Sequence, residues 1–303
     1  MKKKYTIPFL IFTFAFLFFN CDNPDLTPSY LIITKEDMIN CMDVSMYNEE
    51  HEEQLDQAQL EAIASQEFPN VWVYLNGQNL GCWEPPCKIP LLANFVDFNE
   101  IQIFPGVRMN TLSTQVPLYP FVIPFTFSAL MSKEEIYTLE KNPIKFKYAP
   151  SVIFPLIETF EQSTSFSSLN PDGVGMVVSQ ENGENIGLIS LTDTVNSFEV
   201  ATVDYTLKGM GTYLFWELEY KCDNELFIQI RFINNKGVVE YAPLVNLKST
   251  TVWRKAYINL TKKVSDSAGS IGYLKVNLVM NGLKNDIHPT NFYFKNIKLI
   301  TLK

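Results

Sequence analysis

The chain has 303 residues, 47% of them hydrophobic and 14% aromatic, which is enough apolar material for a buried core in one or two domains. Its formal charge is −9 at pH 7, with 24 Lys and Arg against 33 Asp and Glu. Protein binding to nucleic acid depends on Lys and Arg at the phosphates, so this composition argues against a nucleic-acid partner. It also argues against electrostatic adsorption to anionic lipid.

The N-terminus has the pattern of a secretory signal. Three lysines at positions 2–4 precede an apolar run over residues 7–19, which is short for a membrane-spanning helix of about 20 residues. Ordinary signal peptidase cuts after small residues, and residues 16–26 contain no Ala, Gly or Ser. Cys21 is therefore the processing point that remains.

This segment resembles a bacterial lipoprotein signal. The resemblance implies that residues 1–20 are removed and that Cys21 carries the lipid, palmitate among its acyl chains. Loss of the three lysines would change the formal charge to −12. Residues 21–29 would form a tether, and the eight residues after Cys21 span at most about 25–30 Å, which would hold the protein close to the membrane. An uncleaved signal anchor is the alternative.

Most of the remaining chain alternates apolar and polar residues, as half-buried β-strands do. Residues 70–77, 211–221 and 225–234 are the clearest cases, and Asn, Gly, Asp and Pro separate such runs. We therefore predict an all-β chain with two β-sandwich domains. A small Ig-like sandwich is expected over residues 30–150 and a jelly roll over residues 156–303.

Residues 48–66 break the alternation. They are rich in Glu, Gln, Ala and Leu, which favour helix. The segment would be either an acidic surface for a basic partner or a solvated insertion, helical or disordered, in a loop. We expect the insertion, because runs of charge usually form a solvated face.

The segment over residues 73–92 contains the most specific local motif. Asn76-Gly77 between alternating apolar runs predicts a two-residue β-hairpin turn with positive φ at both positions. The segment resembles the small Ig-like repeats of the PEGA type, which implies a scaffold role. Cys82 and Cys87 lie in its return strand, and outside the cytoplasm they could form a disulfide.

We find no constellation of catalytic or metal-binding residues. His51 and His288 are the two histidines, neither lies near a cysteine in sequence, and C-x₄-C alone offers only two zinc ligands. The motif G-x-S-x-G is absent. Glu217 and Glu219 share one strand face about 7 Å apart, but an alternating Glu pair is also typical of a solvent face. We predict no enzyme activity, no cofactor and no bound metal.

Residues 156–303 resemble the jelly-roll modules that bind carbohydrate in extracellular proteins. The resemblance rests on four segments: residues 158–162, 213–221, 250–261 and 291–300. It implies glycan binding. Many such modules hold calcium through an early Glu and a late Asp. Glu161 would be the first ligand, but Lys295 and Asn296 stand at the late position, where a cation opposes calcium.

Most aromatic residues fall on the apolar phase of strands, and we expect Trp216 and Trp253 to be buried. Five aromatics are off-phase and form the predicted ligand or partner surface: Trp72, Tyr74, Trp83, Phe215 and Phe227. They would either cluster on one face or cover the junction between the two domains. Residues 116–127, with three prolines, would either contact a partner or close the first sandwich.

In architecture the whole chain resembles outer-membrane lipoproteins of Bacteroidota, a resemblance that brings no activity with it. Two functions follow. The first is a non-catalytic, lipid-anchored subunit of an outer-membrane protein complex, favoured by the short tether and the off-phase aromatics. The alternative is a carbohydrate-binding lipoprotein with a glycan partner. We expect an outer-membrane location, on either the periplasmic or the cell-surface face.

Overall fold

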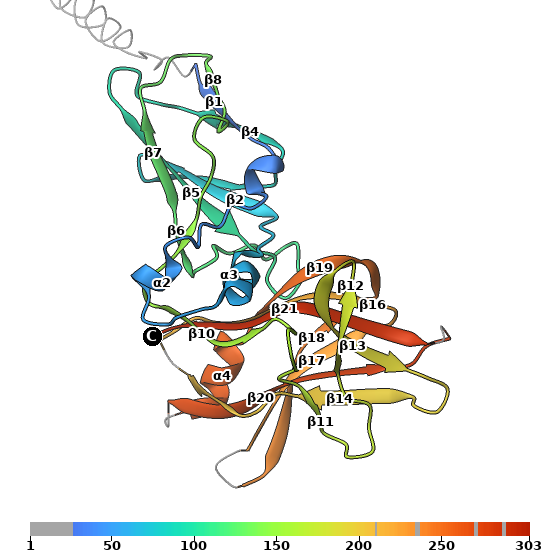
Figure 1. The fold of residues 1–303 in the computed structure, drawn as a ribbon. Helices are drawn as coiled ribbons and strands as arrows, with labels where there is room; N and C mark the ends of the chain where they lie inside the picture. Colours follow the sequence, from blue (N-terminus) through green and yellow to red (C-terminus); the bar gives the residue numbers. More distant parts are fainter. Residues whose placement is uncertain (1–26, 210, 234–236, 270–271, 287–288) are drawn as a thin grey trace, which may run out of the picture.

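The computed structural model describes residues 27–303 except 210, 234–236, 270–271 and 287–288, and two all-β units follow one another along the chain (Figure 1). The predicted lipidation site Cys21 and the histidine His288 lie outside the described residues. None of the helices in the described part of the chain is long and apolar enough to cross a membrane. The predicted all-β class with two sandwiches is confirmed.

The first unit packs a three-stranded sheet, β4-β1-β8, against a four-stranded sheet, β3-β2-β5-β7, with a short pair β6-β9 beside them. Its strands are β1 (Ser29–Ile33), β2 (Asn70–Leu75), β3 (Gln78–Trp83), β4 (Cys87–Leu91), β5 (Asn99–Gly106), β6 (Val122–Ile123), β7 (Phe125–Ala129), β8 (Ile136–Tyr137) and β9 (Lys147–Tyr148). The predicted hairpin is present, because Asn76 and Gly77 have φ values of 50° and 78° between β2 and β3.

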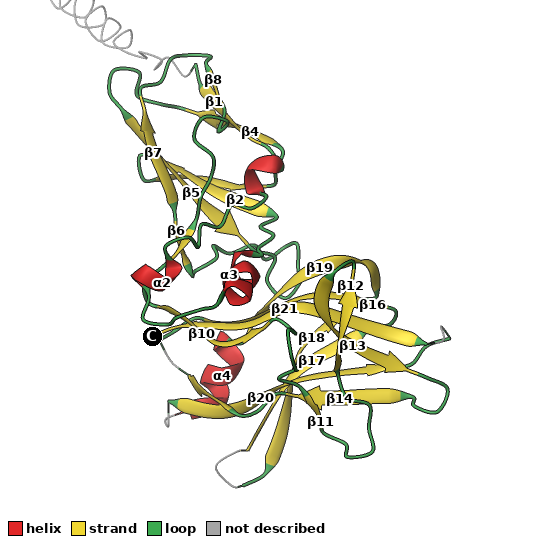
Figure 2. Ribbon diagram, viewed as in Figure 1, coloured by secondary structure: helices red, strands yellow, loops and turns green. Residues whose placement is uncertain are grey.

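The predicted helical segment forms two short helices, α2 (Tyr47–Glu50) and α3 (Gln57–Ala64), after a 3-10 helix η2 (Glu36–Met38). Asp56 caps α3, accepting from the backbone N–H of Gln59 at 2.8 Å, while the Gln59 side chain bonds back to the Asp56 N–H. The prediction of a solvated insertion is wrong. Ala62 and Ile63 are buried, and α3 packs on strands β10 and β21 of the second unit (Figure 2).

The second unit is a jelly roll of two facing six-stranded sheets. The junction sheet has the order β12-β13-β21-β16-β19 with β10 paired to β21, and the distal sheet has the order β11-β14-β20-β17-β18 with β15 paired to β20. Its elements are β10 (Val152–Glu158), β11 (Ser167–Ser168), β12 (Val177–Glu181), β13 (Glu184–Leu191), β14 (Ser197–Ala201), β15 (Tyr205–Lys208), β16 (Leu214–Cys222), β17 (Leu226–Ile233), β18 (Val239–Leu247), β19 (Thr250–Asn259), α4 (Thr261–Ala268), β20 (Tyr273–Leu283) and β21 (Thr290–Leu302).

Every second side chain along each strand points between the two sheets, and these side chains form the core of the jelly roll. Trp216 in β16 is fully buried and stacks on Phe166 with ring centroids 6.4 Å apart. The packing is tight enough to require glycine at Gly187 in β13, since a Cβ there would lie 2.6 Å from a ring carbon of Phe160. Helix α4 closes one end, with Val264 and Ala268 in the same core.

The first unit covers the outward face of the junction sheet. Phe215 and Ile300 on that face belong to the same buried cluster as the core of the first unit. Phe215 packs edge-on against Phe121, with ring centroids 5.2 Å apart. The distal sheet lies on the side of the jelly roll away from the first unit (Figure 1). One broad sheet face of the jelly roll is thus covered, and the other faces outward.

Candidate functional site

The junction holds a buried polar network. Glu217 of β16 is fully buried and accepts hydrogen bonds from the Tyr119 hydroxyl at 2.5 Å and the Gln66 amide at 3.0 Å. The Lys298 ammonium lies 3.5 Å from the carboxylate oxygen that accepts from Gln66. Tyr119 and Gln66 come from the first unit, and Glu217 and Lys298 from the second. The network therefore joins the two units.

Lysines of the jelly roll also cap helix α3. Lys298 donates to the carbonyl oxygens of Ala62 at 2.9 Å and Ser65 at 3.3 Å, and Lys255 donates to Ser65 at 2.8 Å. The last carbonyls of a helix have no partner within the helix and carry partial negative charge, so cations stabilise this end. Burial, together with the neighbouring charge of Lys255, lowers the pKa of Lys298 to about 7.

Glu217 and Glu219, the two carboxylates considered as a catalytic pair, both take part in the contacts of the junction. Glu217 is sealed in the network, and Glu219 is held by the Ser65 hydroxyl, by the Asn296 amide at 3.1 Å and by Lys255 at 3.5 Å. Lysines and hydrogen-bond donors lower the pKa of Glu219 against the effect of its burial. Both carboxylates are thus engaged in contacts between the two units.

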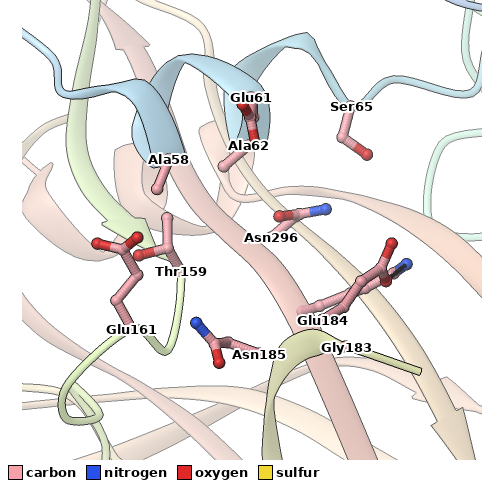
Figure 3. Close-up of a pocket in the computed structure, with 11 residues that line it drawn as sticks. Ala58, Glu61, Ala62, Ser65, Thr159, Glu161, Gly183, Glu184, Asn185 and Asn296 are labelled. Carbon is pink, nitrogen blue, oxygen red and sulfur yellow. Dashed lines mark hydrogen bonds and ion pairs between the residues drawn. The ribbon is translucent and has the colours of Figure 1, made fainter. Parts of the chain in front are cut away.

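A hydrophilic groove of about 430 Å³ runs between α3 and the β12–β13 hairpin (Figure 3). Glu161, predicted as a calcium ligand by resemblance, lines it together with Glu184 and Lys295. Lys295 lies 2.8 Å from Glu184, so a cation of the protein already pairs with one of the carboxylates that a metal would need. No aromatic side chain lines the groove, and no group of three His, Cys, Asp or Glu fit to hold a metal occurs among the described residues.

The outward face of the distal sheet carries aromatic and polar side chains in register. Phe227 of β17 pairs with Asn281 of β20, which pairs in turn with Glu199 of β14. Four residues along, Arg231 pairs with Asn277 on one side and Tyr241 on the other. Paired residues point to the same side of a sheet, so these side chains form parallel rows across one face.

Hydrogen bonds order the polar groups of this face. Arg231 donates to the Asn277 oxygen at 3.0 Å. The Asn277 amide nitrogen donates to the Thr202 carbonyl at 3.0 Å and to Asp204 at 2.8 Å, so its orientation is fixed. Gln229, in the row between, donates to Glu199 at 3.4 Å. One of the five N–H donors of Arg231 is thereby held in place, which orients the whole planar group.

Two small apolar residues in the row of Gln229 are covered by their neighbours on this face. Val279 is fully buried and Ala201 is 3% exposed, although neither belongs to the core cluster of the jelly roll. Phe227 is 37% exposed and Tyr241 45% exposed at the two ends. Four residue rises separate their rows, a span of roughly 14 Å. We call this surface, from Phe227 to Tyr241, the distal face.

The five predicted surface aromatics do not gather on one face. Trp72, Tyr74 and Trp83 are in the first unit, and Phe227 is on the distal sheet. Trp72 donates to the Val116 carbonyl at 3.0 Å, and Trp83 to the Leu80 carbonyl at 3.2 Å. Of the five, Phe227 alone lies on the distal face.

The prediction that Phe215 is exposed is wrong. It is 1% exposed because the first unit covers its face of the sheet, which matches the expectation that off-phase aromatics could cover the junction. The segment over residues 116–127 supplies that cover through Tyr119 and Phe121, both buried. Trp216 is buried as predicted, whereas Trp253 is half-buried and donates to Glu181 at 3.1 Å.

The predicted disulfide is not formed, since Cys82 and Cys87 are both free thiols. The two cysteines belong to different sheets of the first unit. Cys82 pairs with Trp72 in the four-stranded sheet, and Cys87 pairs with Ile33 in the three-stranded sheet. Burial raises the pKa of Cys87 to about 11 and that of Cys82 above its usual value, so both are predominantly protonated at neutral pH.

The described histidine, His51, has a structural role. Its ring stacks on Tyr47 with centroids 3.9 Å apart, and its two nitrogens lie 3.0 Å from the Tyr47 carbonyl and 3.1 Å from the Ala149 carbonyl. The residues that sequence reasoning missed are Gln229, Arg231 and Tyr241. In β17, Gln229 and Arg231 alternate with buried residues, and this alternation was the signal in the sequence that could have identified them as surface residues.

No model of a protein family matches the sequence, and no curated protein matches it. Among solved structures, the C-terminal family 22 carbohydrate binding module of Clostridium thermocellum Xyn10B aligns at 14% identity and TM-score 0.35, covering 49% of this chain and 93% of the module. The family 11 carbohydrate-binding module of Clostridium thermocellum Lic26A-Cel5E aligns at 18% identity and TM-score 0.33, covering 48% and 94%.

The enzymatically active domain of tailspike protein 4 from bacteriophage CBA120 aligns at 12% identity and TM-score 0.34. The match covers 46% of this chain and 20% of the tailspike chain, so it spans a small part of that protein. These TM-scores lie below 0.5, and the assignment of a jelly roll rests on the strand order given above.

Proposed function

We propose that this protein is a non-catalytic glycan-binding protein whose ligand lies on the distal face of the jelly roll. The proposal rests on one observation: exposed aromatic side chains lie in register with ordered polar groups on one face of the distal sheet. Phe227 and Tyr241 offer flat apolar surfaces, and Gln229, Arg231 and Asn281 offer donors and acceptors for hydroxyl groups. Binding sites for small ligands combine aromatic walls with a few placed polar groups in this way.

The position of the distal face supports the proposal. The first unit occupies the outward face of the junction sheet, so the distal face is the broad sheet surface of the jelly roll that a polymer can reach. Its polar groups are held by one another before any ligand arrives, which lowers the entropy lost on binding.

The test is a binding screen of the folded protein against soluble polysaccharides of different backbones, such as xylan, mixed-linkage glucan, mannan and polygalacturonate. Phe227→Ala is expected to weaken binding of any hit at least tenfold by isothermal titration calorimetry. Tyr213→Ala, which removes an aromatic 51% exposed outside the distal face, is the matched control and should bind as the wild type does. Equal loss in both variants, or none in Phe227→Ala, would refute the proposal.

We further propose that a lipid on Cys21 anchors the protein in the outer membrane. The sequence over residues 1–21 supports this, and so does the end of the first unit from which the described chain begins. Ser29 pairs with Leu91 and Tyr30 pairs with Ile136. The segments next to Leu91 and Ile136 therefore lie beside the first residues that the structure describes. Five apolar side chains in the adjoining segments are more than half exposed: Leu92, Val96, Phe98, Leu130 and Ile136.

Such side chains could enter the interfacial layer of a bilayer, adding to the hydrophobic contribution of the acyl chains. Charges of both signs lie at the same end, since the Glu135 carbonyl accepts from the backbone N–H of Tyr30 and Lys88 lies over the Tyr30 ring, so the contact proposed here is that of the apolar side chains. Cys21→Ala is expected to release the protein from sedimented membranes and to block its maturation. Unchanged sedimentation with normal maturation would exclude the anchor.

One observation favours a second function, that of a subunit of an outer-membrane protein complex. Trp72 and Tyr74 lie partly exposed on the outward side of β2, and Tyr74 packs against Phe104 with centroids 5.3 Å apart. A stoichiometric partner in a pull-down from detergent-solubilised membranes, lost in Tyr74→Ala and retained in Tyr213→Ala, would support this function.

A further inference from the structure

A second cavity, of about 670 Å³, lies where the first unit meets the edge of the jelly roll. A loop of the first unit forms one wall, with Arg108, Asn110 and Thr111. The end of β18, the following turn and β19 form the other wall, with Asn246, Lys248 and Arg254. We call this cavity the basic cleft.

Several basic side chains line the basic cleft, although the protein as a whole is acidic. Arg108, Lys248, Arg254 and Lys255 line it, against a single carboxylate, Glu67. Lys255 is 3% exposed and is committed to Ser65 and Glu219 at the junction. The chain as a whole carries a formal charge of −9, so this local excess of positive charge runs against the composition.

Three of these cations have unused binding capacity. Lys248 and Arg254 make no side-chain hydrogen bond or ion pair with any residue that the structure describes. Arg108 pairs with the exposed carboxylate of Glu84 at 3.0 Å, but its Nε is buried and has no hydrogen-bond partner in the described part of the chain. A buried donor without an acceptor costs free energy, so an acceptor that reached this Nε would gain a favourable hydrogen bond.

The wall that presents Arg108 is fixed in place. The backbone N–H of Asn110 donates to the Tyr257 carbonyl at 2.8 Å, and the Asn110 side chain accepts from the N–H of Asn259 at 3.0 Å. Asn110 and Thr111 both have positive φ, 51° and 63°, a conformation that a β-branched residue such as Thr rarely adopts. The contacts with β19 hold this strained turn, and with it the spacing of the cations across the basic cleft.

We propose that the basic cleft binds the carboxylate group of an acidic sugar, so that the glycan recognised by this protein contains uronic acid residues. This inference rests on the proposed glycan-binding function. Arginine pairs with carboxylates through two parallel hydrogen bonds. In the same lining, the Asn246 amide donates to Glu225 at 3.0 Å and the Thr250 hydroxyl to the Val252 carbonyl at 2.8 Å, so their oxygens and the Ser249 hydroxyl are the groups suited to sugar hydroxyls.

The basic cleft continues the distal face. Asn246 lines the cleft and is also the cross-strand partner of Phe227, the aromatic at the nearer end of the distal face. A polymer crossing the edge strand β18 would pass from the aromatic residues to the cations. The apolar face of one ring would then contact the distal face, and the carboxylate of another ring would enter the basic cleft.

The experiment measures binding of tetragalacturonate, and of its fully methyl-esterified form, by isothermal titration calorimetry at low and at physiological salt. The wild type is expected to bind the acid at least tenfold more tightly than the ester. The double variant Lys248→Gln with Arg254→Gln should lose that preference. The control double variant Lys141→Gln with Lys208→Gln removes the same charge at two exposed positions elsewhere and should keep it.

The outcomes separate this inference from the proposed function. If Phe227→Ala loses binding of the acid and the cleft double variant keeps wild-type affinity, the inference about the basic cleft is wrong and the proposed glycan site on the distal face is supported. If only the cleft double variant loses binding of the acid, the result supports carboxylate binding in the basic cleft and counts against a glycan site on the distal face. Equal affinity for the acid and the ester, or equally tight binding of a single-stranded oligonucleotide of matched charge, would overturn the inference.

Discussion

Replacement of Lys298 by Met is expected to change how the stability of the protein depends on pH. Lys298 is fully buried between Glu217 and the end of helix α3, and its pKa is lowered from 10.5 to about 7, first by burial and then by the charge of Lys255. Between those two pH values the unfolded chain holds a proton on this lysine that the folded chain has released. Stability therefore rises as pH increases across that window.

The magnitude follows from the two pKa values. The slope approaches about 1.4 kcal/mol per pH unit, and integration from pH 7 to pH 9 gives roughly 2 kcal/mol. For a unit of this size that corresponds to an increase in melting temperature of roughly 4–8 °C. Above pH 9 stability falls as pH increases. Burial raises the pKa of Cys41 and of Cys222 to about 12, so the folded chain retains thiol protons that the unfolded chain loses.

The assay is differential scanning calorimetry at intervals between pH 7 and pH 9. The stability of the wild type relative to Lys298→Met should rise by roughly 2 kcal/mol across this range, because Met cannot titrate and all other titrating groups are common to both proteins. Lys208→Met removes an exposed lysine and should follow the wild type. Parallel profiles for wild type and Lys298→Met would show that Lys298 keeps its ordinary pKa, and the description of the junction would then be wrong.

Three further substitutions test the packing and the junction. Gly187→Ala places a Cβ 2.6 Å from a buried ring carbon and should destabilise the jelly roll by about 1–3 kcal/mol in urea unfolding, whereas Gly175→Ala, with open space around it, should have no effect. Cys82→Ala should change stability by less than about 0.5 kcal/mol, and a loss of about 2 kcal/mol or more would indicate a disulfide after all. Tyr119→Phe removes a donor to the Glu217 carboxylate and should cost about 1.5–3 kcal/mol by the same measurement.

Much of the fold could be predicted because the signals are local. Alternation over residues 211–221 corresponds to β16, and Asn76-Gly77 takes the positive φ values that a two-residue hairpin demands. The helical composition of residues 48–66 was also visible, but its burial was not. Ala62 and Ile63 are buried against a sheet that begins about 90 residues later in the chain, and no local pattern reports such a contact.

The candidate site was harder to predict, because it depends on register between distant strands. Arg231 and Asn277 are 46 positions apart and meet only because β17 and β20 pair in one alignment, and a shift by one residue would turn each to the core. Phe215 and Phe227 are both off-phase in sequence, yet one is sealed in the junction and the other exposed. The deciding factor is the first unit, which covers one sheet and leaves the other open.

The geometry of the junction also bears on how an anchored protein could reach a polymer. A short tether by itself favours a partner in the membrane, since about 25–30 Å of chain is little reach. The two units, however, share one buried cluster, and buried hydrogen bonds from Tyr119 to Glu217 and from Lys298 to Ala62 join them, so their relative orientation is fixed. The described chain begins at the far end of the first unit, and the distal sheet lies at the opposite end of the molecule (Figure 1). With a lipid on Cys21, the rigid protein would itself hold the distal face away from the membrane, and a short tether becomes compatible with glycan binding.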